Sequence, residues 1–277
     1  MPYSKARSKS LIVFSISSDI GVALAKSRLA QGWRVFGTYR QHSDAVAELD
    51  RLGAIMLPAD FQSRASLGQA CSQLNTLNAG WDELVVAPGS LEPIGPFDSV
   101  DFESWADSIQ VNFVNQLYII HRMLISRHPD ALVILFAGSG TNGTADRFSA
   151  YTVSKIALIK MAELLDSEIS DARFVVVGPG WVKTKIHEQT IDAQSHAGQA
   201  YEETNRRLLT NDFVPMASVI DCLDWISAQD KSTVSGRNIS VSHDRWDEST
   251  FAALLRASPA AGKLRRDSNT LLNRSKN

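Results

Sequence analysis

The stretch SLIVFSISSDIGVALAKSRLAQGWRVFGTY, residues 10–39, decides the fold. It begins with a short apolar run at Ser10–Ile16, continues with a helix-period segment at Asp19–Gln31, and ends with a second apolar run at Arg34–Tyr39. Parallel strands need a crossover connection of about this length, usually a helix, whereas antiparallel strands can be joined by a tight turn. The stretch therefore predicts a strand, a crossover helix and a second strand parallel to the first.

The same alternation continues to about residue 242. The further expected strands are Ala54–Leu57, Glu83–Ala87, Ala131–Ala137, Arg173–Val177 and Asn238–Ser242, and the further expected helices are Ser43–Leu52, Ser63–Leu77, Phe102–Arg127, Ser149–Ile169 and Val214–Ala228. Several strands are too uniformly apolar to have one face in water. We expect an α/β fold with a single doubly wound parallel sheet of about seven strands, covered by helices on both faces, in one domain over residues 1–277.

The composition excludes several classes of protein. The 277 residues are 44% hydrophobic and 21% charged, which is typical of a globular protein, and the formal charge of −2 lacks the basic excess of a nucleic-acid binder. No apolar run approaches the roughly 18 residues that span a bilayer, and no cleavage pattern follows Leu11–Ile16, so we expect no membrane partner and a cytoplasmic location. Cys71 and Cys222 stand far apart and the histidines show no metal-ligand spacing, so we expect no metal.

Two segments depart from the alternation. Residues 181–212 are polar, long and poorly periodic, which in a compact domain favours a functional lid over a plain connector. Residues 258–277 are rich in lysine and arginine, and we expect a basic tail that is solvated or faces a partner.

The strongest candidate for chemistry is the pair Tyr151 and Lys155, in the stretch YTVSK near the start of an expected helix. A spacing of four places both side chains on one helical face. A nearby ammonium favours the phenolate and lowers the pKa of a tyrosine from its usual value near 10, as a general acid and base working near neutrality requires. An isolated match of this kind is more often a surface pair, but the position of this one makes Tyr151 a candidate proton donor.

Three further stretches lead to the same expected edge of the sheet. FAGSGT at residues 136–141 brings small hydroxyl residues to the carboxyl end of a strand, where open α/β sheets bind ligands. Asn112 lies within an expected helix, where an asparagine is mildly unfavourable unless its amide is used. GPGWVKT at residues 178–184 follows the sixth strand. Four elements therefore converge on one edge.

These motifs resemble those of the short-chain dehydrogenase/reductase family over roughly residues 10–242. The resemblance implies a Rossmann-like dinucleotide-binding oxidoreductase domain, with a catalytic set of asparagine, serine, tyrosine and lysine, and with a Pro-Gly pair and a threonine that border the nicotinamide. The matching residues are Asn112, Tyr151 and Lys155 for the catalytic set, and Pro179, Gly180 and Thr184 for the nicotinamide border.

The serine of the family has no clean match. Its usual distance from the tyrosine falls on Gly138, so Ser139 fits only with a one-residue shortening, and Thr141 is a nearby substitute. We favour Ser139 and leave Thr141 open.

The nucleotide end departs further from the family pattern. The family reads T-G-x-x-x-G-x-G after the first strand, whereas residues 14–21 read FSISSDIG and keep only the last glycine. Glycines there permit a tight turn and close approach of the backbone to pyrophosphate at a helix N-terminus. Ser15 adds bulk, and Asp19 can cap the helix but sets a carboxylate close to phosphate, so we expect weakened cofactor binding. The expected contact residues of this loop are Ser15, Ser18, Asp19, Ile20 and Gly21.

Cofactor choice follows from the end of the second strand. No acidic residue stands there to hold the ribose hydroxyls of NAD, and the guanidinium of Arg40 can pair with a 2′-phosphate, which favours NADP(H) and leaves NAD(H) open. Asp60 resembles the adenine-side aspartate of the family. The family's N-N-A-G appears as VAPG at residues 86–89, which leaves Ala87 and Gly89 as backbone contacts.

The resemblance implies hydride transfer between nicotinamide and a carbonyl or alcohol carbon. In this scheme Tyr151 exchanges the hydroxyl proton and Ser139 hydrogen-bonds the substrate oxygen. Lys155 tunes Tyr151 and holds the ribose, and Asn112 fixes a water. Polar and basic side chains crowd the start of the expected lid, so our hypothesis is a small polar substrate such as a sugar or sugar nucleotide. The resemblance also implies a homodimer or homotetramer.

Three alternatives stay open. The eroded glycines fit a non-catalytic dinucleotide-binding sensor. A sugar-nucleotide epimerase or dehydratase shares the tyrosine and lysine motif, but the chain after the sixth strand leaves little room for the larger substrate domain of such enzymes. A serine hydrolase is disfavoured, because AGSGT at residues 137–141 lacks the glycine spacing of G-x-S-x-G.

Overall fold

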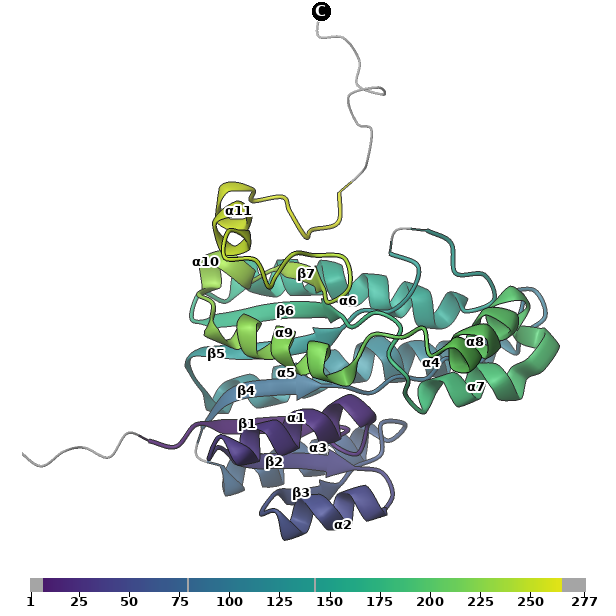
Figure 1. Cartoon of the computed structure of the whole chain (residues 1–277). Coiled ribbons are helices and arrows are strands. Elements are labelled where there is room, and N and C mark those ends of the chain that lie inside the picture. The colour runs from purple at the N-terminus through teal and green to yellow at the C-terminus, as the bar shows by residue number, and fades with distance from the viewer. Residues whose placement is uncertain (1–6, 79, 142, 266–277) are drawn as a thin grey trace, which may run out of the picture.

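Seven parallel strands form one sheet in the order β3-β2-β1-β4-β5-β6-β7 (Figure 1). The structure is a computed structural model, and it describes residues 7–78, 80–141 and 143–265. From β1 the chain winds to β2 and β3 on one side and then adds β4 to β7 on the other, which confirms the predicted doubly wound sheet. The strands are β1 Ser10–Phe14, β2 Arg34–Tyr39, β3 Ile55–Pro58, β4 Trp81–Val86, β5 Arg127–Phe136, β6 Ala172–Gly178 and β7 Arg237–Ser240.

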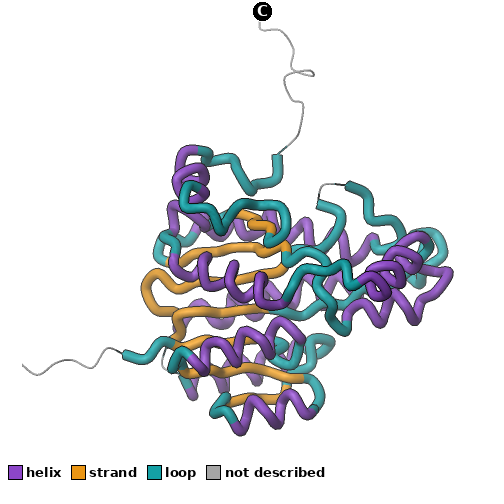
Figure 2. The backbone as a smooth tube through the Cα atoms, viewed as in Figure 1, coloured by secondary structure: helices purple, strands orange, loops and turns teal. Residues whose placement is uncertain are grey.

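Helices cover both faces of the sheet (Figure 2). One face is packed mainly by α1 and α9, and the other by α3, α5 and α6. The α-helices are α1 Asp19–Ala30, α2 Asp44–Arg51, α3 Arg64–Leu77, α4 Phe102–Ile109, α5 Asn115–Met123, α6 Ser149–Glu168, α7 Ile186–Ala193, α8 Gln199–Thr210, α9 Met216–Ala228, α10 Lys231–Val234 and α11 Phe251–Ala257. Among the described helices, none has the combination of length and apolarity that crossing a membrane requires.

The central strands contribute side chains to two hydrophobic layers, one on each face of the sheet. In β1, Ile12 and Phe14 belong to the cluster on the α3 side, whereas Leu11 and Val13 belong to the cluster on the α1 side. All four side chains are fully buried, since successive residues of a strand point to opposite faces and helices cover both. This double burial explains why these strands read as continuous apolar runs in the sequence.

The expected single helix over Phe102–Arg127 was wrong. The segment forms α4, a π-helical turn at Gln110–Val114, α5 and a short 3-10 turn, and β5 already begins at Arg127. A π-helical turn holds one residue more than an α-helical turn and is frequent at functional sites. The insertion centres on Asn112, whose side chain binds the chain outside its own helix.

Residues 181–212, which show no clear hydrophobic period in the sequence, fold into α7, a 3-10 turn and α8. These helices lie beyond the carboxyl ends of the strands, at the right of Figure 1, while α10 and α11 lie toward the opposite end. In the expected tail, Leu264 packs against the hydrophobic core and Arg265 pairs with Glu163 at 2.6 Å. The rest of that tail, residues 266–277, lies outside the described residues.

Candidate active site

Tyr151 and Lys155 lie one turn apart on α6, and both are buried. The Nζ atom of Lys155 lies 5.6 Å from the centroid of the Tyr151 ring and donates a hydrogen bond to the carbonyl oxygen of Pro88 at 3.3 Å. Pro88 follows β4, so α6 meets the carboxyl edge of the sheet at this pair. The helical spacing and the sheet together therefore bring a phenol, an ammonium and a main-chain carbonyl to one place.

The expected lowering of the Tyr151 pKa was wrong for this structure. Burial raises the pKa of Tyr151 to about 12 and lowers the pKa of Lys155 to about 8. Desolvation disfavours the charged form of each group, and here it outweighs the attraction between the phenolate and the ammonium. At neutral pH the phenol therefore keeps its proton, which is the form that can protonate an alkoxide.

Asn112 is fully buried and locks the connection after β4 to the π-helical turn. Its Oδ1 accepts from the main-chain N–H of Ser90 at 3.0 Å, and its Nδ2 donates to the main-chain oxygen of Ser90 at 2.9 Å and to Ser108 Oγ at 3.1 Å. Gln116 Nε2 donates to the main-chain oxygen of Asn112 at 2.8 Å. The asparagine amide is therefore used, as its unfavourable position in a helix indicated, and it fixes the backbone beside Tyr151.

Gly138 is the residue of the β5–α6 connection that contacts the tyrosine. A Cβ atom built on Gly138 would lie 2.7 Å from the Tyr151 hydroxyl and 2.5 Å from its ring, so the ring fills the space of a side chain there. Ser139 is exposed, and Thr141 is half-buried. The position selected by the family spacing thus touches Tyr151 but carries no hydroxyl.

We call residues 181–212 the lid segment, because they lie over Tyr151. The side chains of Phe148, Tyr151 and Ala197 form a buried apolar cluster with Leu91, and Ile186 and Tyr201 pack against it. Two polar contacts hold the start of α7 in place. Gln189 Oε1 accepts from the main-chain N–H of Leu91 at 2.7 Å, and Asp19 Oδ2 accepts from the main-chain N–H of Lys185 at 2.9 Å.

The polar side chains that dominate the composition of the lid segment do not line this cluster. Lys183, Lys185, Glu188 and Asp192 are exposed. One side of Tyr151 therefore packs against apolar side chains, although the lid segment itself is polar and the ammonium of Lys155 lies 5.6 Å from the ring centroid.

The loop between β1 and α1 keeps the shape of a glycine-rich turn with a single glycine. Ser15 adopts a φ of 69°, the left-handed conformation that glycine usually supplies, and thereby ends β1 two residues before the expected Ile16. Ser18 caps α1 by accepting from the N–H of Gly21 at 3.1 Å. A Cβ on Gly21 would lie 2.8 Å from the main-chain oxygens of Ser15 and Ile16, so this position requires glycine.

The backbone of this loop fits the pyrophosphate of a dinucleotide. The first turn of the helix that follows, however, carries the carboxylate of Asp19. The turn, the capped helix N-terminus and the carboxyl edge of the sheet supply the usual anion site of such folds. Asp19 stands in this turn and is held by the lid segment through Lys185. Cofactor binding therefore has to work against the Asp19 charge or displace it.

The other expected cofactor residues lie along the same edge. Arg40 follows β2 and is exposed, and Asp60 follows β3, where it accepts from the N–H of Gln62 at 3.0 Å. Gly180 has a φ of 76° and is packed against Val214 and Ser242, so it makes the turn after β6. Ala87, Gly89, Pro179 and Thr184 lie in the connections after β4 and β6, and Ile20 lies in the first turn of α1.

The sequence did not predict that Ile186 packs in the cluster of Tyr151 or that Gln189 binds Leu91 of that cluster. Gln189 binds a residue 98 positions away, and a Cβ on Gly89 would lie 3.2 Å from Ile186. No local pattern reports such contacts. For Gly138, the spacing to Tyr151 was the available signal.

A doubly wound sheet that brings a buried tyrosine–lysine pair and a helix N-terminus to its carboxyl edge is the architecture of nucleotide-dependent oxidoreductases. A family model described as enoyl-(acyl carrier protein) reductase matches residues 16–243. The chain belongs to the short-chain dehydrogenase/reductase family and is an oxidoreductase of that family, which works with NAD(P)(H).

Individual relatives are distant. The 3-oxoacyl-[acyl-carrier-protein] reductase FabG of Escherichia coli is 25% identical over 204 residues, which cover 67% of this chain and 78% of that protein. Two solved structures share the fold. A short-chain dehydrogenase/reductase from Saccharomyces cerevisiae has a TM-score of 0.74 at 18% identity and covers 86% of this chain and 98% of its own. The RhlG/NADP active-site complex from Pseudomonas aeruginosa has a TM-score of 0.71 at 21% identity, and the match covers 91% of this chain and 99% of that chain.

Proposed function

We propose that this protein transfers hydride between NADP(H) and a carbonyl or secondary alcohol, with Tyr151 as the proton donor and acceptor. The observation that carries the proposal is the buried pair of Tyr151 and Lys155 at the carboxyl edge of the sheet. A bound nicotinamide supplies or accepts the hydride. Tyr151 holds its proton at neutral pH and gives it to the substrate oxygen during reduction.

The neighbouring residues support this step. Lys155 is protonated below a pH of about 8, and its positive charge stabilises the phenolate that remains after proton transfer. Asn112 positions the backbone after β4, through which the proposed water would be held. The hydroxyl that steadies the substrate oxygen is assigned to Ser139, which directly follows the Gly138 that packs against Tyr151, with Thr141 as the alternative.

The cofactor residues are proposed in two groups. The pyrophosphate lies against the loop of Ser15, Ser18, Asp19, Ile20 and Gly21, where a capped helix N-terminus favours an anion. Arg40 holds the 2′-phosphate of NADP(H), with NAD(H) as the alternative. The remaining proposed contacts are Asp60 on the adenine side and Ala87, Gly89, Pro179, Gly180 and Thr184 toward the nicotinamide.

We infer that the substrate carries an apolar group next to its carbonyl, because apolar side chains of the lid segment and of Leu91 and Phe148 pack with Tyr151. The E. coli relative is a 3-oxoacyl reductase, which is consistent with this inference. A sugar or sugar nucleotide is the alternative, and the polar side chains at the start of the lid segment support it.

Assembly into a homodimer or homotetramer and a cytoplasmic location belong to the same proposal. Exposed apolar side chains on α4 and α6 support assembly, since large apolar groups in water favour a protein interface. They include Phe102, Val153 and Leu164.

The test is a fluorescence titration with NADPH and NADH, followed by turnover measurements on aliphatic 3-oxo thioesters and on keto-sugars. We expect saturable NADPH binding and faster turnover of the apolar carbonyl compounds. Faster reduction of keto-sugars would favour the polar alternative. Cofactor binding without turnover of any carbonyl compound would instead support a non-catalytic dinucleotide sensor and contradict the proposed reaction.

A further inference from the structure

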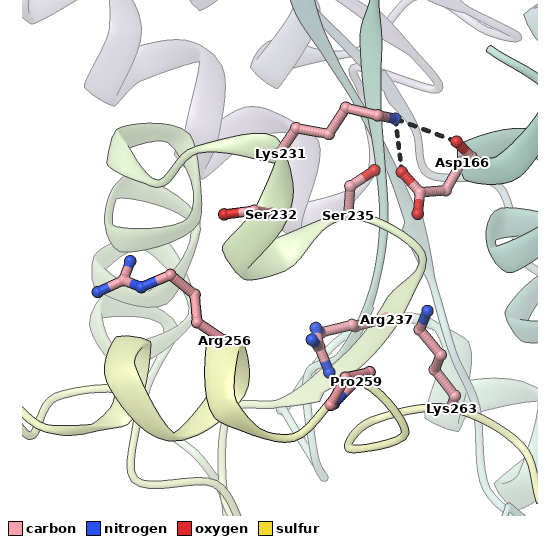
Figure 3. A pocket seen from close by; sticks show the side chains of 8 residues that line it. All are labelled: Asp166, Lys231, Ser232, Ser235, Arg237, Arg256, Pro259 and Lys263. Atoms are coloured by element: carbon pink, nitrogen blue, oxygen red, sulfur yellow. Dashed lines mark hydrogen bonds and ion pairs between the residues drawn. The ribbon is translucent and has the colours of Figure 1, made fainter. Parts of the chain in front are cut away.

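A cavity of about 450 Å³ lies beside the first residue of β7, at the amino edge of the sheet, whereas Tyr151 lies at the carboxyl edge. Figure 3 shows the side chains that line this cavity. Its lining comes from the last turns of α6, from α10, from the first residue of β7, and from α11 and the chain that follows it. Its volume falls in the range of small-molecule sites, about 300–1,000 Å³. The reaction proposed above does not use this cavity.

The lining of this cavity is strongly basic. Four of its side chains are cationic and one is anionic: Lys231, Arg237, Arg256 and Lys263 against Asp166. Asp166 already pairs with Lys231, with 2.5 Å between Oδ1 and Nζ, as Figure 3 shows. Among the described residues, none of the other three cations forms an ion pair with a residue of the lining.

Those three cations also find little compensation around the cavity. The nearest carboxylate to Arg256 is Asp230 at 3.8 Å, a long contact for an ion pair. Lys263 forms no ion pair with any residue in the described part of the chain. Positive charge is thus concentrated at one place in a protein whose formal net charge is −2.

Arg237 shows most clearly that a partner is missing. Its side chain is buried, with 4% of the residue exposed, and its guanidinium donates only to main-chain oxygens, those of Leu255, Ser258 and Ala261. Its Nε atom is buried without any hydrogen-bond partner. Carbonyl oxygens satisfy donors but do not neutralise the charge, and a buried charge without a counter-ion is costly.

The other buried arginines of the described residues differ from Arg237 in this respect. Arg28 has Glu83 at 3.0 Å, and Arg173 has Asp130 at 3.2 Å. Arg237 has no carboxylate within ion-pair distance in the described ranges. An anion bound in the cavity would supply the missing charge.

We propose that this cavity binds a small molecule that carries a phosphate group. The planar guanidinium of an arginine matches phosphate geometry, and a dianion gains from several nearby cations at once. Arg237, Arg256 and Lys263 provide this recognition, and among the described residues only Arg256 of these three has a carboxylate within 4 Å, Asp230 at 3.8 Å.

The test is isothermal titration calorimetry of the full chain with inorganic pyrophosphate. Lys263→Gln removes a charge whose side chain has no described partner, so the variant keeps the fold, and Arg256→Gln is added in a double variant. A matched control is the double variant Arg51→Gln/Arg122→Gln, which removes two charges on α2 and α5, away from the cavity. Melting curves confirm that each variant is folded.

We expect saturable binding to the wild type and to the control, several-fold weaker binding to Lys263→Gln, and at least about tenfold weaker binding to the Lys263→Gln/Arg256→Gln variant. Equal affinity for the wild type and both cavity variants would overturn the proposal, because the pyrophosphate would then bind elsewhere, for example at the loop before α1. Absence of saturable binding would overturn it as well. Neither outcome is evidence for or against the proposed hydride transfer at Tyr151.

Discussion

At the scale of single residues, the environment of Tyr151 depends on two neighbours, Gly138 and Lys155. Gly138 has no side chain, so the phenol ring packs against its Cα, and within the described residues Lys155 has the oxygen of Pro88 as its one hydrogen-bond partner. Both ionisable groups are buried, and burial moves their pKa values apart, up for the tyrosine and down for the lysine. The pair is therefore held as a neutral acid next to a cation that is costly to keep charged.

This cost predicts a gain in stability when the lysine is removed. The pKa of Lys155 falls from 10.5 to about 8 in the folded state, so protonated Lys155 opposes folding below a pH of about 8, and this effect fades as the pH rises toward 10.5. We expect Lys155→Met to raise the free energy of unfolding at neutral pH by about 3 kcal/mol while abolishing turnover. Denaturant unfolding at several pH values measures the difference, which should shrink in alkaline solution.

Lys160→Met is the matched control, since Lys160 lies on the same helix with 45% of its side chain exposed. It should change stability by less than about 0.5 kcal/mol at any pH. A Lys155→Met variant no more stable than the wild type at neutral pH would show that the ammonium is better solvated than its burial implies.

Cofactor preference also belongs to a single residue. Arg40 is exposed at the end of β2, so its guanidinium is available to a 2′-phosphate. We expect Arg40→Asp to shift the ratio of kcat/KM for NADPH and NADH by at least about tenfold toward NADH, because a carboxylate repels the phosphate and can hold ribose hydroxyls. Steady-state kinetics with both cofactors provides the ratio, and an unchanged preference for NADPH would remove Arg40 from the site.

At the scale of elements, the lid segment and α1 are joined through one carboxylate. Asp19 lies in the first turn of α1 and accepts from the N–H of Lys185, directly before α7. Gln189 of α7 ties the same segment to Leu91. Because α7 packs over Tyr151 and Asp19 stands where phosphate is expected, cofactor binding and release of the lid segment are coupled in this account.

This coupling predicts that Asp19→Gly binds NADPH at least about fivefold more tightly than the wild type, since the change removes a negative charge from the expected phosphate site. Asp44→Gly is a closely matched control, because Asp44 also opens a helix directly after a capping serine. Fluorescence titration measures both affinities. Equal tightening in the two variants would point to a general charge effect, and weaker binding in Asp19→Gly alone would contradict the proposed phosphate site.

Some of the helices and strands were predicted from the sequence, and others were not. The strands and the crossover helices were predicted because their patterns are local, with short apolar runs alternating with helix-period segments. The expected capping by Asp19 was wrong, since Ser18 caps α1 and Asp19 is its first residue. The π-helical turn at Asn112 was not predicted, since it depends on hydrogen bonds to Ser90, 22 residues away. The helices of the lid segment were missed because polar residues dominate the segment, and the few side chains that pack at the site, such as Ile186 and Tyr201, give only a weak helical period.

At the scale of the whole molecule, a buried charge network joins α1 and α9 to β4 of the sheet. Arg28 of α1 pairs with Glu83 of β4 at 3.0 Å and also with Asp224 of α9, and Ser227 donates to Glu83. Neither Arg28 nor Glu83 is more than 1% exposed. Three elements far apart in sequence therefore depend on one another, on the face of the sheet packed by α1 and α9.

Removing the central carboxylate should destabilise the protein strongly. Glu83→Ala leaves the guanidinium of Arg28 buried with a partly exposed partner, and we expect a loss of about 3 kcal/mol in the free energy of unfolding. Asp171→Ala breaks an ion pair with Arg127 in which the Asp171 side chain is 52% exposed. This variant should lose less than about 1 kcal/mol in the free energy of unfolding. Urea unfolding compares the two, and similar small losses would show that the buried network adds little.

The global arrangement was predictable because a chain of alternating strands and helices has few ways to cover a parallel sheet. The site was predictable in part: the Tyr151–Lys155 pair followed from helical spacing, and the edge of the sheet followed from strand direction. The sequence predicted a lid over residues 181–212, but the contacts of the lid segment with Tyr151 and the raised pKa of that residue depend on packing between distant segments and were not predicted.

The measurement that bears most directly on this account is the turnover of Tyr151→Phe beside its affinity for NADPH. The substitution keeps the ring that packs against Gly138 and removes only the hydroxyl. We expect kcat to fall by at least about a thousandfold, while the dissociation constant for NADPH changes less than about threefold. Substantial turnover by Tyr151→Phe, with the cofactor bound as in the wild type, would contradict proton transfer by Tyr151.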